Sequence, residues 1–142
     1  MASHAAIRWV EGHRLVAADE FGASIVIDSK EEDHEPQGFR PVTLLLASLA
    51  GCVAYDVVEI LQKQRQTFTA LAIDVQGEQD ADPPWTFRRI HMTFTLRGEG
   101  LDRAKIEHAV QLSEEKYCSV AATLRPNATI TTSVVIEEEA RS

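Results

Sequence analysis

The fold of this protein depends most on one stretch, PVTLLLASLAGCVAYDVV, at residues 41–58. It is too long and too apolar for a strand, and its apolar residues recur at spacings of three and four, which predicts a helix. Pro41 suits the first helical position, and the pattern continues to about Gln66. One stripe of this helix holds Leu45, Leu49, Cys52 and Asp56, and a second holds Leu46, Val53, Val57 and Ile60. Because most of its circumference is apolar, we expect the helix to be covered on nearly all sides. One subunit of 142 residues would struggle to provide this cover alone, which favours a dimer.

Short runs of alternating or β-branched residues predict strands on both sides of this helix. Turn signals at residues 11–12 and 20–22 separate three strands before it, and a polar loop fills residues 29–40. The predicted strands are Ile7–Val10, Leu15–Ala17, Ser24–Ile27, Ala70–Asp80, its antiparallel mate Phe87–Leu96, and Thr129–Ile136, with a second helix from Leu101-Asp102. The order β-β-β-α-β-β-α-β predicts the α+β class, with antiparallel sheets and a long buried central helix that carries the first cysteine. We expect one domain over residues 1–142.

Charge and composition narrow the classes of partner. The net charge of −8 repels phosphate backbones, so we expect no nucleic acid as a partner. Ser48, Asp56 and Glu59 interrupt the apolar stretch, which favours a buried helix over a membrane span. The first ten residues lack the basic and apolar regions of a secretory signal. A cytoplasmic, reducing location is therefore expected, where a standing structural disulfide is improbable.

The two cysteines, Cys52 and Cys118, are then either inert core residues or reactive groups. Small residues surround Cys52, which lets another chain, a substrate or another sulfur approach it closely. The separation of Cys52 and Cys118 in the sequence does not show whether their side chains touch. There is no Cys-x-x-Cys, no His-Glu-x-x-His and no glycine-rich phosphate loop, so we expect no metal and no cofactor. A cysteine–histidine pair stays open, but nothing singles out one of the five histidines.

The chain resembles a known family at three places. Residues 41–58 resemble the first-cysteine helix of the OsmC/Ohr family, and Lys116–Val120 resembles the segment with the second cysteine of that family. Trp9–Arg14 resembles the opening hairpin of the OsmC-like branch. The resemblance extends from about Ile7 to Glu138. It implies an intertwined homodimer with two active sites at the subunit interface, without metal or flavin.

This resemblance also implies an activity, the reduction of organic hydroperoxides to alcohols. Cys52 would attack the peroxide and become a sulfenic acid, and Cys118 would condense with it to form a disulfide. An external dithiol, such as one of the lipoyl type, would then reduce the disulfide. The open alternative is a member of the same fold without peroxidase activity, which binds a small apolar ligand at the dimer interface. A general oxidoreductase acting on protein thiols is disfavoured because it would use an exposed Cys-x-x-Cys.

Burial in an apolar helix raises the pKa of a cysteine in general, so a cation is expected near the attacking thiol. Family members use an arginine that is commonly held by a carboxylate. The resemblance selects Arg14, and Arg40 is a second candidate. Hydroperoxidases of the family carry a glutamate soon after the helix-opening proline, where this chain has Val42 and Thr43. Asp56, one turn beyond Cys52, is the candidate substitute; its alternative role is a buried aspartate satisfied by Tyr117 or by backbone groups. Ser119 stands where typical members have proline.

Overall fold

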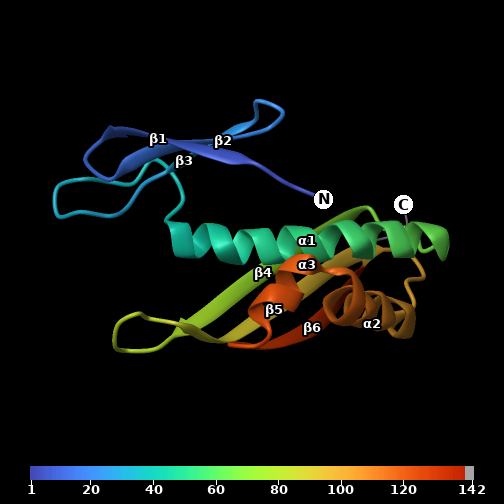
Figure 1. Ribbon diagram of the computed structural model, residues 1–142. Coiled ribbons are helices and arrows are strands. Elements are labelled where there is room, and N and C mark those ends of the chain that lie inside the picture. The colour runs from blue at the N-terminus through green and yellow to red at the C-terminus, as the bar shows by residue number, and fades with distance from the viewer. Residues whose placement is uncertain (140–142) are drawn as a thin grey trace. The chain divides into compact units, whose positions relative to one another are not determined.

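The structure is a computed structural model that describes residues 1–139. The chain divides into two compact units, the first spanning Met1–Leu45 and the second beginning at Leu46. Figure 1 traces the elements along the chain, with strands and helices in the order that the sequence predicts. The α+β class is confirmed.

The first unit is a three-stranded antiparallel meander in the order β1-β2-β3. It consists of β1 (Ala5–Glu11), β2 (Arg14–Asp19) and β3 (Ser24–Ile27). Gly12 and Gly22 occupy the two turns with φ of +51° and +86°, the region that glycine adopts without a steric penalty. Every residue of β1 is exposed, so this sheet buries little apolar surface within its own unit.

The polar loop after β3 returns to the strand that it leaves. The Phe39 N–H donates to Val26 O, and the Asp28 N–H donates to Phe39 O. Gly38 permits this close return, because a Cβ at that position would lie 2.1 Å from Val26 O. The loop is therefore fastened at both ends to β3.

The helix α1 (Pro41–Lys63) begins at the proline, as predicted. From Leu46 onward it buries one face, and the other face remains open: Tyr55 is 83% exposed. The expectation of cover on nearly all sides is not met within one chain, because the second unit packs against one side of the helix. By length and composition alone α1 could cross a bilayer, which is weak evidence because the core helix of a soluble protein passes the same test.

The second unit contains a mixed sheet in the order β4-β5-β6. The strand β4 (Ala70–Gln79) pairs antiparallel with β5 (Phe87–Gly98), as predicted, and β5 pairs in parallel with β6 (Thr129–Glu138). A parallel neighbour needs a crossover connection, which α2 (Arg103–Leu112), the π-helical turn η1 (Ser113–Tyr117) and α3 (Ser119–Leu124) provide. Asp102 caps α2 by accepting the Ala104 N–H at 2.9 Å.

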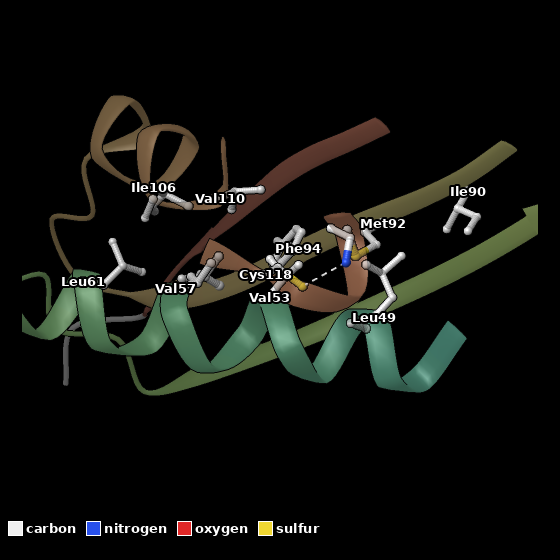
Figure 2. Close-up of a cluster of buried hydrophobic side chains, with 14 of the residues drawn as sticks. Leu49, Val53, Val57, Leu61, Ile90, Met92, Phe94, Ile106, Val110 and Cys118 are labelled. Carbon is white, nitrogen blue, oxygen red and sulfur yellow. Dashed lines mark hydrogen bonds between the residues drawn. The ribbon is translucent and has the colours of Figure 1, made fainter. Parts of the chain in front are cut away.

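The core of the second unit lies between one face of this sheet and the two longer helices. Period-two alternation points every second residue of β5 inward. The inward set meets the buried stripe of α1 and the apolar side of α2, as Figure 2 shows. Those labelled there are Leu49, Val53, Val57, Leu61, Ile90, Met92, Phe94, Ile106, Val110 and Cys118. One of the two cysteines thus belongs to the core.

Candidate active site

Cys52 lies in the middle of α1 and is half-buried, whereas Cys118 is 2% exposed. Both are free thiols. Cys118 stands between η1 and α3, and its sulfur accepts the Ala121 N–H at 3.3 Å, so it caps α3. Cys52 packs against the core cluster that contains Cys118, and it lies close enough to influence the Cys118 thiol. The fold therefore brings together the two cysteines, as the resemblance implies and as their sequence separation alone could not show.

The two thiols differ in their surroundings. Burial, and then the neighbouring Cys52, raise the pKa of Cys118 from 9.0 to about 11. At neutral pH Cys118 is consequently a protonated thiol, which is a poor nucleophile and a good hydrogen-bond donor. Cys52 has access to solvent and faces a protonated neighbour. The arrangement suits Cys52 as the thiol that reacts first and Cys118 as the thiol that reacts second.

A π-helical turn sets the position of Cys118. At the end of η1 the Cys118 N–H donates to Ser113 O at 2.8 Å, which closes the wide turn before the chain leaves the helix. Such turns are rare and frequently occur at functional sites. Sequence reasoning missed η1, because its residues show no pattern that separates a π-turn from an ordinary helix end.

Asp56 is satisfied by η1 as well. The Ser113 hydroxyl donates to Asp56 Oδ2 at 2.6 Å, and Ser113 itself is fully buried. The sequence suggested Tyr117 or backbone groups as the partner of this aspartate; Tyr117 is 55% exposed, and Ser113 takes that role. The Asp56–Ser113 bond ties α1 to the turn that presents Cys118.

Arg14, at the start of β2, lies among carboxylates. Its Nε donates to Asp28 Oδ2 at 3.4 Å, and its Nη1 donates to Glu11 Oε1 at 3.2 Å. The arginine therefore has the acidic partner that the sequence around Val42 and Thr43 lacks.

Asp28 is the functional candidate that sequence reasoning missed. It is 1% exposed, and its carboxylate accepts the backbone N–H of Gln37 and a hydrogen bond with His34 Nε2, in addition to Arg14. The Ser29 N–H donates to its other oxygen. These bonds, led by that from Gln37, hold the pKa of Asp28 well below its ordinary value of 3.8 despite burial. The sequence did contain a signal for Asp28, because Arg14 and Asp28 flank two strands that the hairpin pattern predicts.

Arg40 precedes α1 and lines a surface pocket of about 340 Å³ with Lys30 and Phe39, among others. Within residues 1–139 it forms no ion pair. Arg14 and Arg40 thus belong to the first unit, and Cys52, Asp56 and Cys118 belong to the second. In the part of the chain that the structure describes, no three His, Cys, Asp or Glu side chains are arranged to hold a metal ion.

This combination of a long cysteine-bearing helix, a late buried cysteine and two small sheets matches a known protein family. The family model described as OsmC-like protein matches residues 32–133. The chain belongs to the OsmC-like family. The match begins in the polar loop and includes both cysteines, whereas β1–β3 lie outside it.

Among OsmC-like relatives, Protein YhfA of Escherichia coli K12 is 36% identical over 127 residues, which cover 89% of this chain and 92% of the relative. A hypothetical protein from Aquifex aeolicus VF5 superposes with a TM-score of 0.87 at 26% identity and covers 99% of both chains. An organic hydroperoxide resistance protein OsmC from Legionella pneumophila superposes with a TM-score of 0.70 at 17% identity, covering 95% of this chain and 97% of that one. The first two names specify no reaction, and the third similarity shows the fold.

Proposed function

We propose that this OsmC-like protein is a thiol-dependent peroxidase that reduces organic hydroperoxides to alcohols. The observation that carries the proposal is the pairing of a half-buried Cys52 with a buried Cys118 that lies next to it in the core. The name of the Legionella protein, organic hydroperoxide resistance protein, supports the same reaction on the same fold.

The reaction begins when the Cys52 thiolate attacks one oxygen of the peroxide. The S–O bond forms as the O–O bond breaks, and the leaving alkoxide takes a proton to become an alcohol. Cys52 is then a sulfenic acid. The Cys118 sulfur attacks the Cys52 sulfur, water leaves, and the Cys52–Cys118 disulfide remains. An external dithiol, such as dihydrolipoamide, returns both thiols to the reduced form by exchange and is itself oxidised to a disulfide.

The surroundings of the thiols support this order of attack. A peroxide reaches a half-buried sulfur more easily than one that is 2% exposed. The pKa of Cys118 is raised mainly by burial and partly by the neighbouring Cys52. Burial persists after Cys52 is oxidised, so Cys118 has to lose its proton as its sulfur attacks the sulfenic acid.

We propose Arg14 as the cation that stabilises the Cys52 thiolate, with Arg40 as the second candidate. The two acidic partners of Arg14 support this choice, since family members hold the corresponding arginine with a carboxylate. Asp56 is the weaker candidate for that carboxylate, because its Oδ2 already accepts the Ser113 hydroxyl.

A homodimer is part of the proposal. Ile7 and Trp9 on β1 are 57% and 67% exposed, and Tyr55 on α1 is 83% exposed. Large apolar side chains on both elements favour cover by a second copy. Gly51 supports this, because a Cβ there would meet nothing within 4 Å in its own chain. Glycine at an exposed helix position lowers the stability of the helix by about 1 kcal/mol relative to alanine. A second chain that packs closely against Gly51 would explain why glycine stands there. We place the dimer in the cytoplasm, where a dithiol reductant keeps thiols reduced.

A second function is favoured by one observation, the absence of the family glutamate at Val42 and Thr43. In that case the protein would bind a small apolar ligand at the dimer interface, and the cysteines would not turn over. Reactivity of Cys52 towards peroxide separates the two functions.

The test is the consumption of cumene hydroperoxide, with hydrogen peroxide for comparison, by the wild-type protein and dihydrolipoamide. We expect rapid loss of the organic peroxide and weaker activity on hydrogen peroxide. Cys52→Ser is expected to abolish consumption. Cys118→Ser is expected to complete one turnover and then stop at the sulfenic acid. Ser119→Ala, which changes an exposed neighbour of Cys118, is the matched control.

Two results would contradict the proposal. If the wild type left the peroxide unconsumed with both thiols intact, ligand binding would become the better function. If Cys118→Ser cycled at the wild-type rate with the dithiol, Cys118 would not be the resolving cysteine.

A further inference from the structure

We infer that Asp28, assisted by Glu11, positions Arg14 for the reaction at Cys52 and replaces the family glutamate that is missing after Pro41. This inference rests on the proposed function, and it assigns a role to a residue that the hydroperoxidase pattern does not contain. Asp28 touches no reacting atom and is a positioning residue.

Strand register places Asp28 opposite Arg14. The strands β2 and β3 pair Val16 with Val26 and Leu15 with Ile27. The next pair in the same antiparallel register is Arg14 and Asp28. Residues directly opposite in a sheet have their Cβ atoms about 5 Å apart, within reach of a carboxylate and a guanidinium. The pairing of β2 with β3 therefore brings these two side chains within contact distance, independently of the loop that follows β3.

The carboxylate is held independently of the arginine. The Gln37 N–H donates to Oδ2 at 3.0 Å, the Ser29 N–H donates to Oδ1 at 2.9 Å, and His34 Nε2 lies 2.9 Å from Oδ2. Asp28 is 1% exposed, and it would be costly to bury without these partners. The acceptor is therefore preorganised, and Arg14 docks against a group that stays in place.

Two anions fix the guanidinium in two directions. Asp28 takes Nε, and Glu11, which pairs with Arg14 across the β1–β2 turn, takes Nη1. Among residues 1–139 no hydrogen bond is formed by Nη2. A planar guanidinium held at two nitrogens has a fixed orientation, and its third nitrogen remains free to donate. This is the arrangement expected of an arginine that must meet a thiolate or a peroxide oxygen.

The hairpin offers a matched control. Asp19 also accepts two backbone N–H groups, those of Phe21 and Ala23, each at 2.9 Å. Within residues 1–139 it forms no ion pair with an arginine. Asp19→Asn therefore changes a carboxylate that organises a turn without changing the partner of Arg14.

The experiment uses full-length protein and two rates. The first is the rate of sulfenic acid formation with cumene hydroperoxide. The second is the rate of Cys52 alkylation by iodoacetamide as a function of pH, with Cys118→Ser as the background so that one thiol reacts. We expect Asp28→Asn to lower both rates at neutral pH by about 10- to 100-fold, since misplacement of a catalytic group by about 1 Å has effects of this size. Asp19→Asn should stay within about twofold of wild type.

A double-mutant cycle decides whether Asp28 acts through Arg14. Arg14→Gln should lower both rates at least as much as Asp28→Asn, and the double variant Arg14→Gln/Asp28→Asn should be no slower than Arg14→Gln alone. Additive losses would overturn the inference, because Asp28 would then act on the fold and not on the arginine. Glu11→Gln, at a side chain that is 71% exposed, provides the same test if Asp28→Asn fails to fold. It should slow both rates about two- to fivefold, and in the Arg14→Gln background it should have no effect.

The two rates also separate this inference from the proposed function. If the wild type reduced no peroxide but the alkylation rates followed the pattern above, Asp28 would still position Arg14 and the peroxidase proposal would be wrong. If alkylation of Cys52 were unchanged in Arg14→Gln, Arg14 would not act on Cys52 and the inference would be overturned.

Discussion

The two units of this chain are stabilised in different ways. The unit that begins at Leu46 buries apolar side chains from α1, β5 and α2, many without any exposed surface. In the unit that ends at Leu45, Ile27 and Asp28 are the buried residues, and the second is charged. The first unit is therefore held by strand pairing and by polar contacts to one carboxylate. Hydrophobic burial, the dominant stabilising contribution in folding, is concentrated in the other.

This difference parallels the proposed division of chemistry. The cysteines lie in the unit with the packed core, where their mutual position is fixed on both sides by buried neighbours. The arginine lies in the first unit, which buries few side chains, and charge-assisted hydrogen bonds fix its orientation there.

The largest expected effect breaks the core of the second unit. Phe94 has no exposed surface and packs between α1 and α2, so Phe94→Ala should lower the free energy of unfolding by about 3–5 kcal/mol. Phe21→Ala in the first unit, at a side chain that is 86% exposed, should change it by less than about 1 kcal/mol. Urea denaturation followed by circular dichroism measures both. Equal losses of unfolding free energy in the two variants would mean that hydrophobic burial stabilises the first unit as much as the second.

A smaller effect concerns the open face of α1. Gly51→Ala adds a methyl group where the chain itself has open space, so an isolated chain should gain up to about 1 kcal/mol from helix propensity. In the proposed dimer the same methyl group should obstruct the second copy and raise the dissociation constant about tenfold, which is about 1.4 kcal/mol. Sedimentation across a concentration series tests this, with Gln62→Ala on the exposed end of α1 as the control. A monomeric wild type would contradict the dimer.

The smallest effect is confined to the first unit and appears at acid pH. The pKa of Asp28 is lowered in the fold, so its stabilisation is complete above the ordinary value of 3.8 and declines as the pH falls below it. In a Trp85→Phe background the fluorescence of Trp9, whose Nε1 donates to Gly12 O at 2.9 Å, reports on β1 alone. We expect this signal to change below about pH 4. Asp28→Asn should remove the transition, and an identical titration in that variant would show that another group is responsible.

Most of the fold was accessible from the sequence, because the decisive signals are local. Pro41 marks the start of α1, Asp102 marks the start of α2, and alternation defines β4 and β5. The parallel pairing of β6 with β5 was not predicted, since it depends on how the crossover packs and no residue of β6 records it. An incompletely covered α1 was expected for a single subunit, but periodicity shows only that a stripe is apolar and does not show what covers it.

The candidate site was predictable in kind and less so in its contacts. Cysteine chemistry was inferred from residue type and resemblance, but the burial of Cys118 beside Cys52 is a product of tertiary packing. Ser113 could not be named as the partner of Asp56 without the π-turn that aims its hydroxyl. Asp28 is the instructive omission, because the predicted hairpin already contained the register that sets it opposite Arg14. The family pattern places the carboxylate soon after Pro41, whereas the pairing of β2 with β3 places it at Asp28.

The cap of α3 links the proposed chemistry to backbone order. The Cys118 sulfur that accepts the Ala121 N–H is the same sulfur that would bond to Cys52 in the oxidised form. A helix of six residues has little stability of its own, so it depends on its cap more than a long helix does. The first turn of α3 is thus thermodynamically linked to the oxidation state of the protein: an interaction that orders this turn through the thiol favours the reduced form, and oxidation removes part of that order. The amide proton of Ala121 is accordingly a built-in probe, whose exchange with solvent would report whether the Cys118 thiol has been oxidised.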